Sequence, residues 1–166
     1  LREVTAHVSV PVLAAGGIAD GRKIAAALLM GAAGVLIGTR FYAAQESLGH
    51  AKAKARLVSS SGEQTLRTDT FDIIRELDWP ANYTGRALAN RLTQRWHGDS
   101  DALRQHRATE VARFQEAMAT GDFDTGVIFA GEGLDLVQDV PPAAAIIDRL
   151  MAETERALSA GAGMVR

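Results

Sequence analysis

Two short apolar runs, each ended by glycine, constrain the fold of this 166-residue chain more than any other feature. The run from Val10 to Ala15 stops at Gly16–Gly17, and the run from Gly34 to Ile37 stops at Gly38. Apolar residues at consecutive positions are typical of a strand that is covered on both faces in a parallel sheet. Two parallel strands need a crossover connection between them, and that connection is right-handed.

The segment between the runs has the pattern of a helix. Four of its residues fall at the i, i+3, i+4 and i+7 positions of one helical face: Ile24, Ala27, Leu28 and Gly31. Asp20 is a suitable N-cap, and Gly31 is a suitable stop. The first part of the chain is therefore predicted to be a strand–helix–strand unit of an α/β fold.

The rest of the chain is more polar and is predicted to be mostly helical. We expect residues 60–83 to be irregular, and Trp79, Tyr83 and Trp96 to be packing aromatics. The expected helices are Phe41 to Ser59 in one or two pieces, Thr84 to Trp96, Ala102 to Thr120 with Asp101 as cap, and Pro141 to about Ala160. The expected division is 1–60 for βα units, 61–140 for a mostly helical region, and 141–166 for a C-terminal helix.

Composition excludes several classes of protein. With 18 basic and 20 acidic side chains, the chain has no charge excess for binding nucleic acid. It has no cysteine, so disulfides, thiolate metal sites and a thiol nucleophile are excluded, and a reducing compartment such as the cytoplasm fits. No apolar run approaches the ~18 residues of a membrane span. Its histidines, His7, His50, His97 and His106, lack metal-site spacing and are expected to be surface or packing residues.

The glycine-bearing strand ends are the candidate binding site. Glycine lets an anion approach the backbone closely, and the first turn of a following helix adds N–H donors. In (β/α)8 barrels such a phosphate cup forms after strands 7 and 8, with a short extra helix, which Thr39 to Gln45 would supply here. Glycines that only make tight turns are the alternative, and the dinucleotide and P-loop motifs are absent. Arg40 is expected to form a salt bridge rather than to contact the phosphate.

These glycine segments resemble the phosphate-binding end of nitronate monooxygenases, formerly called 2-nitropropane dioxygenases. A similar core occurs in FMN-dependent enoyl-acyl-carrier-protein reductases, and a looser one in IMP dehydrogenases. The resemblance covers essentially the whole chain, and the downstream segments favour the monooxygenases. The segments that carry it are 11–21, 31–35 and 37–41 for the phosphate site, and 67–72, 79–80, 84–91 and 129–132 downstream.

The resemblance implies the C-terminal part of an FMN-binding (β/α)8 barrel, with strands 7 and 8 and part of a helical second domain. It also implies oxidation of alkyl nitronates by O2 to a carbonyl compound and nitrite. The residues that would hold the FMN phosphate are Gly16, Gly17, Leu36, Ile37, Gly38 and Thr39. Leu36 stands where relatives often have a polar residue, so its contact would be through the backbone.

Two departures from the family pattern leave alternatives open. The family's active-site histidine lies in an upstream Gly-Gly-His motif, which this chain lacks, so we expect a fragment that starts near strand 7 and is inactive by itself. Phe129 and Glu132 stand where relatives commonly have Trp and Gln in a stretch near the substrate pocket. An NAD(P)H-dependent enoyl reductase and a non-catalytic fragment remain the alternatives.

Overall fold

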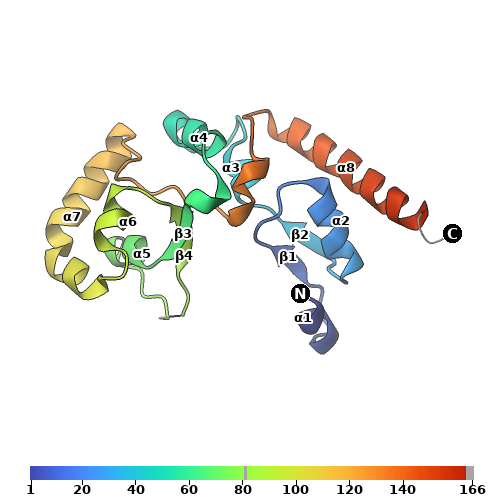
Figure 1. Ribbon diagram of the computed structural model, residues 1–166, viewed down its shortest axis with the longest axis horizontal. Helices are drawn as coiled ribbons and strands as arrows, with labels where there is room; N and C mark the ends of the chain where they lie inside the picture. The colour runs from blue at the N-terminus through green and yellow to red at the C-terminus, as the bar shows by residue number, and fades with distance from the viewer. Residues whose placement is uncertain (81, 164–166) are drawn as a thin grey trace. The chain divides into compact units, whose positions relative to one another are not determined.

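The computed structural model describes residues 1–80 and 82–163, which form two compact units (Figure 1). One unit contains residues 1–48 and continues from Gly133, and the other contains residues 49–132. Residue 81 of the expected second domain and residues 164–166 of the expected C-terminal segment lie outside the described residues.

The first unit is built on the predicted strand–helix–strand motif. Strands β1 (Leu13–Ala15) and β2 (Gly34–Leu36) pair in parallel, and helix α2 (Gly21–Leu29) connects them (Figure 1). Helix α1 (Arg2–His7) precedes the motif, and the short helix α3 (Thr39–Tyr42) follows it. The α/β class is confirmed, and so is the short helix after the second glycine turn.

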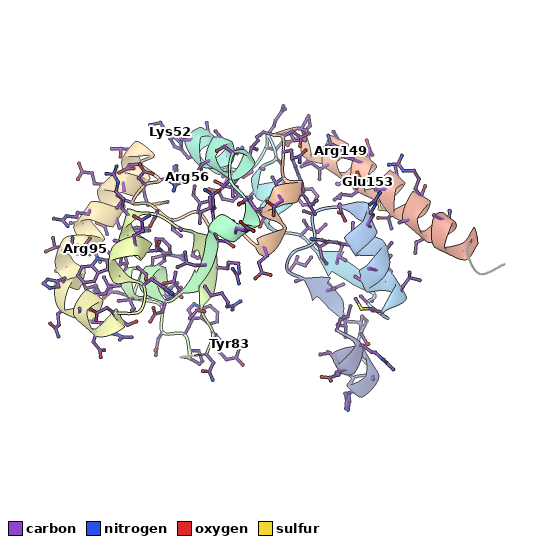
Figure 2. The ribbon with its side chains drawn as sticks, viewed as in Figure 1. Lys52, Arg56, Tyr83, Arg95, Arg149 and Glu153 are labelled. Carbon is purple, nitrogen blue, oxygen red and sulfur yellow. The ribbon has the colours of Figure 1, made fainter. Side chains whose placement is uncertain are left out.

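Helices α2 and α8 form the core of this unit. Asp20 caps α2 by accepting a hydrogen bond from the Lys23 N–H at 2.8 Å, as predicted. Helix α8 (Ala143–Gly163) packs along α2 (Figure 1) and carries charged side chains such as Arg149 and Glu153 (Figure 2). The buried cluster that joins the two helices contains Ile24, Ala44, Ile146 and Leu150.

The two strands are shorter and more exposed than their apolar sequences predict. Leu13 is 59% exposed, Leu36 is 65% exposed, and Val10 lies outside β1. Among the described residues, each of these strands pairs only with the other, and neither strand contains a buried residue. The expectation of buried strands was therefore wrong for this structure, although the parallel pairing was right.

The second unit packs helices against a short antiparallel ribbon. Its strands β3 (Thr65–Thr68) and β4 (Gly85–Leu88) pair from Thr65 with Leu88 to Thr68 with Gly85. Its other elements are α4 (Ala51–Val58), the 3₁₀ turn η1 (Gly62–Gln64), α5 (Thr70–Ile74), α6 (Arg91–Trp96) and α7 (Ser100–Thr120). Its buried cluster contains Phe71, Ile74, Ala87, Leu92, Trp96, Leu103, Phe114 and Val127.

The ribbon corrects two expectations. The segment predicted as one helix from Thr84 to Trp96 is strand β4 followed by α6, which Asn90 caps through a hydrogen bond from the Thr93 N–H. The region 60–83, predicted to be irregular, contains β3 and α5. Pairing between distant segments decides strand formation here, and local propensity does not report it.

Three further expectations can be compared directly with the structure. Asp99, rather than Asp101, caps α7 by accepting a hydrogen bond from the Ala102 N–H at 3.3 Å. Trp96 is buried as expected, whereas Trp79 and Tyr83 are exposed and were wrongly predicted to pack. Within residues 1–80 and 82–163, no helix combines the length and the apolar character that crossing a membrane requires.

Candidate functional site

The six predicted phosphate residues lie at or just after the ends of two paired strands. The register pairs Ala15 with Leu36, so Gly16 and Gly17 begin beside Ile37 and the residues that follow it. Helix α3 begins at Thr39, directly after Gly38, and the Tyr42 N–H closes its first turn on the Gly38 carbonyl at 2.9 Å. The structure therefore brings both glycine turns and the start of α3 to one edge of the sheet.

The glycines at this edge keep it open. Gly16 and Gly17 adopt φ of +93° and +68°, the left-handed region that favours glycine. Gly38 has φ of −96° and ψ of −72°, which other residues adopt, so its turn does not need glycine for conformation. Apart from the chain neighbours, no atom of the described residues lies within 4 Å of the position that a Cβ would take at any of the three. This glycine cradle, residues 16, 17 and 36–39, has the space that close backbone approach of an anionic group requires.

Two contacts that sequence reasoning missed support the first glycine turn. The Lys23 ammonium donates a hydrogen bond to the Gly17 carbonyl at 2.8 Å. Gly133 packs on the same peptide, since a Cβ there would lie 2.6 Å from the Gly17 oxygen. Both contacts lie on the carbonyl side of the turn and hold it in place. The only signal for Gly133 in the sequence was its place beside the Gly131–Glu132 segment.

Arg40 makes the salt bridge that the sequence favoured. Its side chain is buried and donates hydrogen bonds to the Asp139 carboxylate at 2.9 Å and to the Asp139 carbonyl at 2.8 Å. Arg149 binds the other oxygen of the same carboxylate at 2.9 Å. The hydrogen bond from Arg149, together with the positive charge of Arg40, holds the pKa of Asp139 below its usual range. Arg40 therefore anchors α3 to the 137–140 segment.

Tyr42 ends α3 and is half-buried. Burial raises the pKa of its phenol, so the side chain is neutral at physiological pH. It therefore brings no negative charge to the helix that borders the cradle.

The stretch that contains Phe129 and Glu132, predicted to lie near a substrate, makes its contacts within the second unit. Glu132 forms an ion pair with Arg86 at 2.6 Å, and Phe129 forms a bridge with Ala87. The Phe129 ring packs on Phe71 at 6.3 Å. These contacts make the stretch part of the packing of the second unit.

The histidines match the expectation of surface or packing roles. His7 is exposed, His50 caps α4 by accepting a hydrogen bond from the Lys52 N–H, and His106 stacks on Trp96. Among the residues that the structure describes, no group of three or more His, Cys, Asp or Glu side chains could hold a metal ion.

A parallel strand pair with glycine turns at both strand ends and a helix after the second defines an α/β protein with a glycine-lined edge. The family model for nitronate monooxygenase matches residues 1–153, and the chain belongs to this family of flavin-dependent oxidoreductases. The nitronate monooxygenase npaC of Metarhizium robertsii is 36% identical over 150 residues, which cover 85% of this chain and 40% of that protein.

Two solved structures share the fold. FabK from Thermotoga maritima superposes with a TM-score of 0.79 and 30% identity, over 98% of this chain and 50% of that one. A nitroalkane oxidase from Streptomyces ansochromogenes superposes with a TM-score of 0.78 and 28% identity, over 96% of this chain and 43% of that one. The chain thus spans half the length, or less, of these three relatives.

Proposed function

We propose that this chain forms the phosphate-holding end of an FMN-dependent enzyme that oxidises alkyl nitronates with O2 to a carbonyl compound and nitrite. The observation that carries the proposal is the glycine cradle, which family membership connects to a flavin. In this reading β1 and β2 are strands 7 and 8 of a (β/α)8 barrel. Residues 61–140 then contribute to a mostly helical second domain, and the segment 141–166 contributes α8 as the closing helix.

In this proposal, each residue of the cradle has its own role in binding the FMN phosphate. The absence of side chains at Gly17 and Gly38 lets the FMN phosphate reach backbone N–H groups, and Gly16 shapes the turn. Leu36 and Ile37 contribute backbone atoms, and Thr39 would donate its hydroxyl. The positive end of α3 adds a favourable field for the dianion. The bound flavin supplies the redox chemistry, which is the part of the reaction that these residues do not perform.

The reaction is tested by assaying the intact protein that carries this sequence, purified with FMN. We expect O2 consumption and nitrite release with propionate-3-nitronate, and no NADH oxidation with a crotonyl thioester. The opposite pattern would assign the enoyl reductase activity instead.

Residues 1–166 alone are expected to bind FMN weakly or not at all and to be inactive, because the proposed catalytic histidine belongs to a motif that they do not contain. A yellow, active preparation of those residues alone would contradict this part.

A cytoplasmic location belongs to the same proposal and fits the cysteine-free sequence.

Gly38 provides the sharpest test of the cradle. Replacing Gly38 by alanine adds a methyl group where no atom lies within 4 Å, on a backbone that alanine adopts without strain. We expect an unchanged free energy of unfolding. We also expect FMN binding to weaken by about tenfold or more, because charge-assisted hydrogen bonds of ~1.5–3 kcal/mol are lost. Flavin fluorescence titration of the intact protein measures both FMN and riboflavin affinity.

Riboflavin and a second glycine supply the controls. Riboflavin lacks the phosphate, so Gly38→Ala should leave its dissociation constant unchanged. Gly161→Ala places a methyl group in open space on α8 and should affect neither ligand. Equal weakening of FMN and riboflavin would show that Gly38 does not act on the phosphate.

A further inference from the structure

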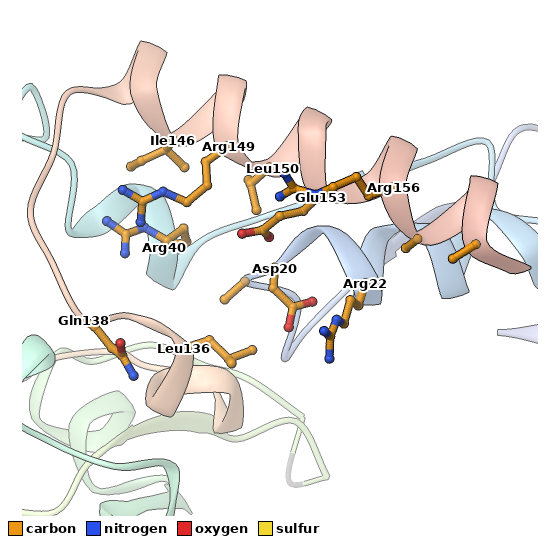
Figure 3. A pocket seen from close by; sticks show the side chains of 13 residues that line it. Asp20, Arg22, Arg40, Leu136, Gln138, Ile146, Arg149, Leu150, Glu153 and Arg156 are labelled. Atoms are coloured by element: carbon orange, nitrogen blue, oxygen red, sulfur yellow. The ribbon is translucent and has the colours of Figure 1, made fainter.

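A second pocket lies in the same unit as the glycine cradle. It has a volume of about 670 Å³, within the range of small-molecule sites. The start of α2, Arg40 on α3, the segment that carries Leu136 and Gln138, and one face of α8 line it (Figure 3). None of the six residues of the cradle belongs to this lining.

Positive charge predominates in the pocket. Four arginines line it, Arg22, Arg40, Arg149 and Arg156, against two carboxylates, Asp20 and Glu153 (Figure 3). Both carboxylates already accept hydrogen bonds from the first turn of α2: Asp20 from the Lys23 N–H at 2.8 Å, and Glu153 from the Gly21 N–H at 2.9 Å. Each carboxylate therefore has one oxygen occupied by the start of α2, and the four arginines outnumber the two carboxylates.

The four arginines fall into two pairs. Asp139 holds Arg40 and Arg149, and the buried Arg40 Nε has no hydrogen-bond partner among the described residues. Arg22 and Arg156 are exposed, and within residues 1–80 and 82–163 neither side chain forms a hydrogen bond or an ion pair. Two guanidinium groups that line the pocket are thus available to an anion.

The rest of the lining is apolar. Leu136, Ile146 and Leu150 contribute aliphatic surface, and alanines continue it along α8. An inorganic ion would leave this surface in water, whereas a ligand with an aromatic or aliphatic body would cover it. Guanidinium groups bind phosphate oxygens through paired hydrogen bonds, which suits Arg22 and Arg156 to a phosphate or pyrophosphate group.

We propose that this pocket binds an organic phosphate, a phosphate or pyrophosphate group joined to an apolar or aromatic body, at a site separate from the glycine cradle. The organic body lies on the apolar lining, and the phosphate lies between Arg22 and Arg156. The proposal does not depend on the nitronate reaction, since no residue of the cradle takes part.

Calorimetric titration of the intact protein with ADP, pyrophosphate and adenosine tests the proposal. We expect ADP to bind more tightly than either pyrophosphate or adenosine, because only ADP offers both parts. The double variant Arg22→Gln/Arg156→Gln should weaken ADP binding by about tenfold or more, and added salt should weaken it in the unaltered protein. Both residues are exposed, so the variant should keep its melting temperature.

Arg104→Gln on α7 removes the same kind of charge outside the pocket and serves as the matched control. ADP affinity in this variant should equal that of the unaltered protein, and FMN affinity should be the same in all three proteins. Three results would overturn the proposal: no ADP binding, ADP binding that the double variant leaves unchanged, or competition between ADP and FMN. Equal affinities for ADP and pyrophosphate would reduce the pocket to a simple anion site and would also reject an organic ligand.

Discussion

Replacing Gly21 by alanine is expected to lower the free energy of unfolding by about 3 kcal/mol, at the upper end of the cost of overpacking. Gly21 begins α2 at the point where this helix meets α8. A Cβ at this position would lie 2.3 Å from the Glu153 Cβ, 2.4 Å from the Thr154 nitrogen and 2.6 Å from the Leu150 carbonyl oxygen. Two of these atoms belong to the α8 backbone, so the clash cannot be relieved by a rotamer change. The helices must separate, which exposes the cluster around Ile24 and Leu150.

Urea denaturation followed by circular dichroism measures this effect, with Gly161→Ala as the matched control on α8. Among the described residues, no atom outside its chain neighbours and its own helix backbone lies within 4 Å of the Gly161 Cβ position, so alanine there should raise stability by roughly 0.5–1 kcal/mol through helix propensity. If Gly21→Ala matched the unaltered protein in stability, the close packing of α2 on α8 would be wrong.

Replacing Asp139 by alanine is expected to cost about 2 kcal/mol, since it removes the carboxylate from the buried Arg40 guanidinium and leaves the hydrogen bond to the carbonyl of residue 139. The carboxylate side chain is 42% exposed, so water can reach part of the gap, and the cost falls below that of a fully buried pair. Asp148→Ala removes the same charge from the exposed side of α8 and should change stability little.

Acid titration supplies a second measurement for Asp139. Because its pKa is depressed in the folded protein, its contribution is complete above the ordinary pKa of an aspartate and is lost as the pH falls through the lower folded-state pKa. Asp139→Ala should lack this component of the acid destabilisation, whereas Asp148→Ala should retain it. Identical acid profiles for Asp139→Ala and the unaltered protein would remove Asp139 as a stabilising partner of Arg40.

Patterns within a short stretch of sequence predicted the first unit well. The spacing of Ile24, Ala27 and Leu28 indicated α2, and Asp20 was correctly identified as its cap. The same local reasoning failed between residues 60 and 90, where β3 and β4 depend on each other and neither shows alternation of its own. Trp79 and Tyr83 were misplaced for a related reason, since an aromatic residue in a loop carries no local sign of its exposure.

The same difference between local and long-range information applies to the candidate site. By itself, the sequence determined the two glycine turns, the short helix that follows the second, and the family, because each depends on residues that are neighbours along the chain. Only the tertiary structure placed Gly133 against Gly17, and only it set Asp139 between Arg40 and Arg149. Arg40 and Asp139 are 99 residues apart, and the pocket with its four arginines needs α2, α3 and α8 together. Such contacts depend on how helices pack. The periodicity of a single helix predicts which of its faces is buried, but it does not predict which other helix covers that face.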